Sequence, residues 1–129
     1  MTIPARLPDL PNPCTPGAYL ERRRIAEGLS RRDVSLVYVD HIESARIAEL
    51  TIGEFEADRR IAPLAALLRL RKAFKFDAHI YCALAEDLPI PTLCRRCGCS
   101  WQDPCDDEER GPCGWSADPT LCTHCEDPR

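Results

Sequence analysis

Cysteine residues are concentrated near the C-terminal end of the sequence. Seven of the nine cysteines lie between Cys94 and Cys125. The outer four form two Cys-x-x-Cys pairs, Cys94/Cys97 and Cys122/Cys125, and such a pair directs two thiolates at one point. Two pairs provide the four ligands of a tetrahedral zinc ion. The sequence therefore predicts a zinc site with these four cysteines as its first-choice ligands.

Three further cysteines, Cys99, Cys105 and Cys113, lie between the two pairs. Together with His124 they complete eight ligands, enough for two tetrahedral sites, and a thiolate shared between two zinc ions would serve equally well. With a single zinc ion, the extra cysteines would instead be small buried thiols. An iron–sulfur cluster is a further alternative, because four cysteines also suit one. One zinc ion is thus predicted, and a second remains open.

The Cys-rich segment contains little else around which to fold. Its large apolar residues other than cysteine are Trp101, Trp115 and Leu121, too few to offset the entropy of the chain. The N-terminus shows no secretory signal, so we expect a cytoplasmic protein whose clustered thiols bind metal rather than form disulfides. The apolar-rich stretch 61–70 is too short to span a bilayer, and no membrane partner is expected.

Charge separates the Cys-rich segment from the rest of the chain. Residues 1–90 contain 13 Lys/Arg and 13 Asp/Glu, whereas residues 91–129 contain 4 Arg and 8 Asp/Glu. An acidic segment binds phosphates poorly, so any nucleic-acid contact is expected in the first 90 residues. A zinc ion with four thiolates has no open position, and no phosphate-binding loop or activated nucleophile is present in the sequence. We therefore expect no enzymatic activity.

The elements before the cysteines are predicted to be helical. Residues 1–16 hold five prolines and should form an extended arm. Five helical patterns follow. The first covers residues 17–27, and the second starts at a capping box formed by Ser30 and Asp33 and ends near Tyr38. The other three cover residues 42–56, the residues after Pro63, and residues 77–86. The third is one helix or two interrupted near Thr51–Gly53. In the fourth, the apolar residues expected on one side are Leu64, Leu67, Leu68 and Phe74.

The domain organisation follows from these patterns. Pro89 and Pro91 separate the helices from the cysteines. We expect a mainly α protein with a Pro-rich arm (1–16), a five-helix bundle (17–88) and a small, irregular, zinc-stabilised Cys-rich module (92–127).

Two strings in the helical part resemble the lambda-repressor/Cro-like (XRE) helix-turn-helix family. YLERRRIAEGLSRRDVS is similar to its opening and FEADRRIAPLAALLRLRKAFKFD to its closing part, together covering about residues 17–87. The matching positions of the opening are Leu20, Arg24, Gly28, Leu29, Ser30 and Val34. The chain is longer than the family norm between the two strings. The resemblance implies a DNA-reading helix at about residues 48–56, with Glu49, Gly53 and Glu54 facing outward. Glutamate at base edges accepts only from cytosine and repels phosphates.

The same resemblance implies a function. In an XRE-like bundle, Arg31, Arg32, Arg59 and Arg60 would contact phosphates of double-stranded DNA, whereas the alternative is a solvated face paired with acidic neighbours. The cysteine pattern resembles small Cys-rich tails of phage and prophage proteins, some of which follow a divergent XRE-like bundle. The leading hypothesis is a small DNA-binding transcriptional regulator whose zinc tail mediates homodimerisation or partner contact.

Two other classes of function remain open. One is a phage-type protein-binding module or inhibitor, which would contact a host protein through the acidic tail or through the bundle at Glu49, Glu54 and Glu56. The other is a redox sensor built on an iron–sulfur cluster.

Overall fold

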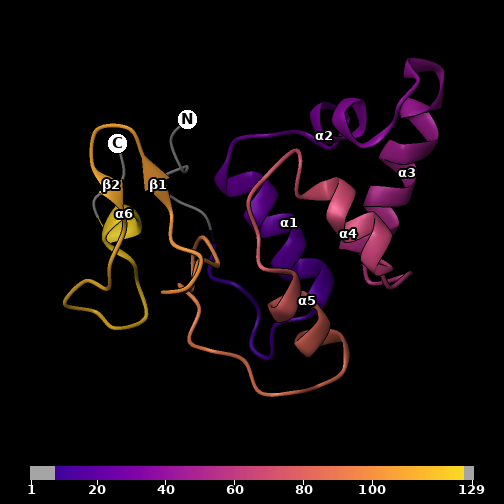
Figure 1. The fold of residues 1–129 in the computed structure, drawn as a ribbon. Helices are drawn as coiled ribbons and strands as arrows, with labels where there is room; N and C mark the ends of the chain where they lie inside the picture. The colour runs from indigo at the N-terminus through magenta and orange to yellow at the C-terminus, as the bar shows by residue number, and fades with distance from the viewer. Residues whose placement is uncertain (1–7, 127–129) are drawn as a thin grey trace.

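The computed structural model describes residues 8–126 and is mainly helical (Figure 1). Residues 1–7 of the predicted arm and residue 127 of the predicted module lie outside the described residues. The elements are α1 (Pro16–Ala26), α2 (Arg31–Tyr38), the 3-10 turn η1 (Ile42–Ser44), α3 (Ala45–Glu56), α4 (Leu64–Leu70), α5 (Ala78–Ala85), β1 (Asp106–Asp107), β2 (Gly111–Pro112) and α6 (Thr123–Glu126). Within the described range, no helix is long and apolar enough to cross a membrane.

The helix starts confirm two sequence signals. The Thr15 hydroxyl accepts a hydrogen bond from the backbone N–H of Ala18 at 3.1 Å and caps α1. At α2, the Ser30 hydroxyl accepts from the Asp33 N–H, and the Asp33 carboxylate accepts from the Ser30 N–H. This reciprocal pair is the predicted capping box.

Of two other local predictions, one is confirmed and one is corrected. The helix α3 runs without interruption through Thr51–Gly53, which is one of the two alternatives expected for this segment, and the turn η1 precedes it. On α4, Leu67 is buried but Leu64 and Leu68 are exposed. The helix is short and buries the face of Ala66, Leu67 and Leu70, so the two other leucines lie outside the core.

The core of the bundle lies between α1, α2, α3, α4 and α5. Its buried apolar side chains include Tyr19, Leu20, Val34, Ile52, Phe55, Leu67, Leu70, Phe76 and Tyr81. Helix α1 approaches the end of α3 so closely that a Cβ on Gly17 would lie 2.5 Å from the carbonyl oxygens of Phe55 and Glu56. The absence of a side chain at Gly17 therefore permits this packing.

A buried ion-pair network joins the first three helices. Glu56, at the end of α3, accepts hydrogen bonds from Arg24 of α1 at 2.7 and 2.9 Å and from Arg31 of α2 at 2.8 Å. The Glu56 side chain is buried, which corrects the expectation that it faces a partner protein. Its charge instead joins α2 and α3 to α1.

The Cys-rich region packs against α1 and does not hang free as a tail (Figure 1). Arg22 and Arg23 of α1 donate hydrogen bonds to the carbonyl oxygens of Arg96 and Cys97. Lys75 donates to the carbonyl oxygen of Pro104 at 2.6 Å. Ala26 of α1 belongs to the same buried cluster as the cysteines. The bundle therefore supplies part of the wall around the thiols.

Candidate metal centre

A tight loop presents the first three cysteines of the cluster. The backbone N–H of Cys94 donates to the carbonyl oxygen of Cys99 at 2.8 Å, and that of Gly98 donates to the carbonyl oxygen of Cys94 at 2.9 Å. Gly98 has φ +80°, and its Cα faces the Arg23 side chain, which would lie 3.4 Å from an added Cβ. Glycine permits this left-handed backbone conformation. The turn directs Cys94, Cys97 and Cys99 into one interior.

The remaining cysteines come from a hairpin and a helical turn. Cys105 and Cys113 flank the β1–β2 hairpin, where the Cys113 N–H donates to the Cys105 carbonyl oxygen at 2.8 Å. Cys122 precedes α6 and Cys125 lies within it. The Thr123 N–H donates to the Gly114 carbonyl oxygen at 2.8 Å and joins this turn to the hairpin.

The seven thiols meet in one cluster. The sulfur of Cys97 lies 3.4 Å from that of Cys105 and 3.9 Å from that of Cys122, and the sulfurs of Cys99 and Cys113 are 3.6 Å apart. Two sets of four sulfurs have all their members within 4.8 Å of one another: Cys94, Cys97, Cys99 and Cys122, and Cys99, Cys105, Cys113 and Cys122. Clustered thiols with this geometry are compatible with a metal site.

The arrangement of the predicted ligands differs in detail from the simplest expectation. The first set contains Cys99 where the two Cys-x-x-Cys pairs would supply Cys125. Cys125 is buried nonetheless, and its thiol borders those of Cys122, Cys94 and Cys97. His124 is buried on α6 but belongs to neither set.

Crowding alters the pKa values of the thiols in opposite directions. Hydrogen bonds from the thiols of Cys122, Cys125 and Cys97 hold the pKa of Cys94 far below its ordinary value. The pKa of Cys97 is raised, chiefly by Cys105 and further by burial. Thiolates this close repel one another, so they cannot all ionise unless a cation neutralises them. The cluster is therefore suited to binding a metal cation.

A buried arginine lies beside the cluster, and the sequence analysis did not identify its role. Arg23 is only 2% exposed and donates from Nη1 to the Cys97 carbonyl oxygen at 3.0 Å. Among residues 8–126, no carboxylate lies within ion-pair distance of it. Burial alone would lower the pKa of Arg23, but the neighbouring thiols of Cys97 and Cys105 outweigh that effect and raise it. The signal in the sequence was the triple arginine at the centre of a helix that has an apolar face.

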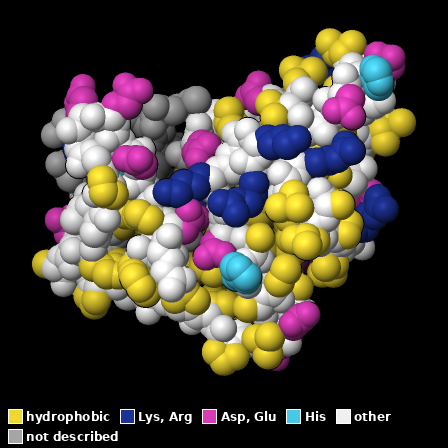
Figure 2. All heavy atoms as spheres, in the orientation of Figure 1, with side chains coloured by type: hydrophobic (Ala, Val, Ile, Leu, Met, Phe, Trp, Pro, Cys, Tyr) yellow, Lys and Arg dark blue, Asp and Glu magenta, His cyan; other side chains and the backbone are white. Residues whose placement is uncertain are grey.

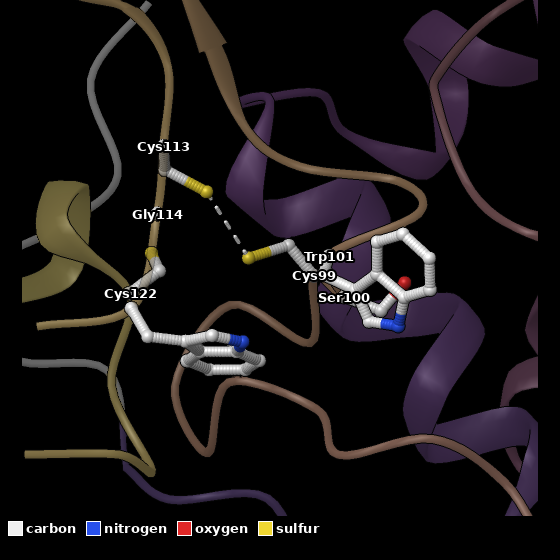
Figure 3. Close-up of a pocket in the computed structure, with 7 residues that line it drawn as sticks. Cys99, Ser100, Trp101, Cys113, Gly114 and Cys122 are labelled. Carbon is white, nitrogen blue, oxygen red and sulfur yellow. Dashed lines mark hydrogen bonds between the residues drawn. The ribbon is translucent and has the colours of Figure 1, made fainter.

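One side of the cluster borders a surface pocket (Figure 3). Cys99 and Cys113 point toward each other at its edge, and Cys122 lines it from the segment beside Cys113 and Gly114. Trp101 and Trp115 form its other walls. The two tryptophans thus lie beside the cluster at the surface of the molecule.

The arginines expected to contact DNA are mostly paired with carboxylates. Arg31 bonds to Glu56 and lies 3.2 Å from Glu21. Arg32 lies 4.0 Å from Glu49, and Arg60 lies 3.5 Å from Glu54. Arg59 is exposed, and within the described part of the chain no ion pair involves it.

Comparisons of the chain with protein-family models, curated proteins and solved structures found no match.

Proposed function

We propose that this protein is a non-enzymatic, protein-binding regulator that contacts its partner through the surface formed by α2, η1 and α3. The observation that carries the proposal is the exposure of Val37, Ile42, Ile47 and Leu50, which all lie on these elements. Ile47 is 70% exposed and Leu50 is 58% exposed. Hydrophobic side chains gather at the upper right of Figure 2, over the corner where α2 leads into α3. Contiguous exposed apolar surface marks interaction sites in soluble proteins.

The charges of the same surface favour a protein partner over a phosphate backbone. Helix α3 contains one basic residue, Arg46, against Glu49, Glu54 and the buried Glu56. Arg31 and Arg32 already have carboxylate neighbours. Phosphate binding derives its affinity from the release of counterions by unpaired cations, and this surface offers few.

In this proposal the cysteine cluster holds structural zinc. Thiolates fill every position of the ion, so no position is open for water or a substrate. The metal stabilises the Cys-rich region and, through Arg22 and Arg23, fixes it to the bundle. Elemental analysis and a visible spectrum of the purified protein test this role: we expect zinc and no colour, whereas iron with a brown colour would show an iron–sulfur cluster instead.

The partner surface is tested with a matched pair of double variants. Ile47→Ser/Leu50→Ser removes apolar side chains from α3, and Leu64→Ser/Leu68→Ser removes two leucines of similar exposure, 62% and 55%, from α4. In affinity capture from nuclease-treated cell extract, we expect a partner that binds the wild type and the α4 variant but is lost with the α3 variant. Since all four side chains are exposed, both variants should fold. Equal capture by the two variants, or no specific capture by the wild type, would contradict the proposal.

DNA binding is the second candidate, because the capped α2 followed by α3 has the order of a helix-turn-helix and exposed cations lie nearby. Arg69, Arg71 and Lys72 are exposed, and in the described structure no carboxylate lies within ion-pair distance of them. Figure 2 shows Lys and Arg side chains in a band across the middle of this face.

DNA binding has its own test. If DNA binding is the function, adding the protein to a labelled duplex at about 50 mM salt should raise the fluorescence anisotropy of the duplex, and this binding should weaken steeply by about 200 mM salt. Arg31→Ala/Arg32→Ala should weaken that binding. We expect no such binding. If the affinity for the duplex falls both at higher salt and in Arg31→Ala/Arg32→Ala, DNA binding would replace the protein-binding proposal.

A further inference from the structure

We propose that the seven clustered cysteines bind two zinc ions, with the Cys122 thiolate bridging them. The first ion is then held by Cys122 with Cys94, Cys97 and Cys125, and the second by Cys122 with Cys99, Cys105 and Cys113. This inference rests on the structural zinc proposed above and specifies its number and ligands.

The separations of the sulfur atoms match those of ligands around zinc. With a Zn–S distance of about 2.3 Å, tetrahedral geometry places two thiolates of one ion about 3.8 Å apart. The sulfurs of Cys97 and Cys122 are 3.9 Å apart, and those of Cys99 and Cys113 are 3.6 Å apart. One of these pairs belongs to each ion, whereas the 3.4 Å contact between the sulfurs of Cys97 and Cys105 joins the ligand set of the first ion to that of the second. A disulfide would require about 2 Å instead.

Cys122 is one of two cysteines with access to both sets, and we assign it the bridge. It belongs to both groups of mutually close sulfurs, and its backbone N–H donates to the Cys94 sulfur at 3.5 Å. Cys99 also belongs to both groups, but its sulfur faces Cys113. Cys125 lies in the same buried cluster, on the helical turn that follows Cys122, and so takes the fourth position around the first ion. Cys99 is then left to the second ion.

This assignment uses every thiol of the cluster. A single zinc ion would leave three buried or half-buried thiols beside it without a cation. Two ions that share one thiolate need seven ligands, the number in the cluster. Each set also has one sulfur that accepts a backbone hydrogen bond: Cys94 from the Cys122 N–H, and Cys113 from the Cys105 N–H at 3.2 Å. Such bonds orient thiolate ligands and stabilise their charge.

The buried Arg23 provides independent support. Seven thiolates with two zinc ions keep an excess of negative charge, and a buried anion needs a cation nearby. Arg23 lies against the Cys97 backbone and, within residues 8–126, has no carboxylate partner. A buried guanidinium without a carboxylate is costly unless another anion compensates it. The thiolate cluster provides that anion.

Native mass spectrometry of the folded protein tests the number of ions. We expect two zinc ions per chain in the wild type and one in Cys113→Ala or Cys125→Ala, because each change removes a ligand from a single site. Cys82→Ala is the control: Cys82 is exposed on α5, outside the cluster, and this variant should keep two ions. Two ions retained in Cys125→Ala would overturn the ligand assignment.

The bridge is tested on the intact chain, because Cys122→Ala removes a ligand from both ions and need not fold. After replacement of zinc by an NMR-active cadmium isotope, we expect two cadmium resonances, each correlated with the β protons of Cys122. Correlation of Cys122 with one resonance only would overturn the bridge. One metal ion per chain would overturn it while leaving the structural zinc proposal intact, and an absence of metal would overturn both.

Discussion

Glu56→Ala is expected to lower the free energy of unfolding by about 3–5 kcal/mol, the cost of breaking a buried ion pair from one side. The Glu56 carboxylate accepts hydrogen bonds from Nε and Nη2 of Arg24 at 2.7 and 2.9 Å. Its removal leaves the buried Arg24 guanidinium with only the partly exposed Glu21 carboxylate, 3.9 Å away. Chemical denaturation followed by circular dichroism measures the loss.

Two further variants separate charge compensation from packing. Glu49→Ala, on the same helix, removes a partly exposed carboxylate whose partner Arg32 lies 4.0 Å away, and should cost less than about 1 kcal/mol. Arg24→Met/Glu56→Leu replaces both buried charges by apolar groups and should restore much of the stability lost in Glu56→Ala. Equal losses in Glu49→Ala and Glu56→Ala would contradict the assigned role of Glu56.

Removal of the metal is expected to unfold the Cys-rich region and to loosen α1, while α2, α3 and α4 stay folded. The Cys-rich region has few apolar residues besides its cysteines, so its folding free energy derives mainly from metal binding. Arg22 and Arg23 of α1 donate to the carbonyl oxygens of Arg96 and Cys97, and these bonds are lost when the loop unfolds. The Arg23 side chain, which is buried in the intact fold, then becomes exposed to water together with the neighbouring surface of α1.

Hydrogen exchange with and without a strong chelator measures this effect segment by segment. Protection should disappear over residues 92–126, fall in α1, and persist in α3, where Ile52 and Phe55 lie in the separate core of the bundle. Added zinc should restore the original pattern. If verified removal of the metal left residues 92–126 protected, the metal would not be the main source of their stability.

The sequence by itself determined the helical elements and the segment whose clustered cysteines are compatible with a metal site. Capping boxes and Cys-x-x-Cys spacings act over a few residues, so Ser30 with Asp33 and the paired cysteines could be recognised from local chemistry alone. The distribution of exposed leucines on α4 was mispredicted because a helix of 7 residues has too few turns for its apolar pattern to define a face.

Only the tertiary structure decided how these parts combine. Charged residues give no periodic signal of their burial, so the sequence did not reveal that Arg22 and Arg23 are buried, and it placed Glu56 on a partner-binding face. In the fold, Arg24 and Glu56 neutralise each other inside the bundle, and Arg22 and Arg23 bind the carbonyl oxygens of the cysteine loop. The proximity of Cys122 to both sets of thiols likewise depends on three separate segments meeting in space. Spacing along the chain specifies which thiols a turn brings together, whereas contacts between distant segments depend on packing of the whole chain.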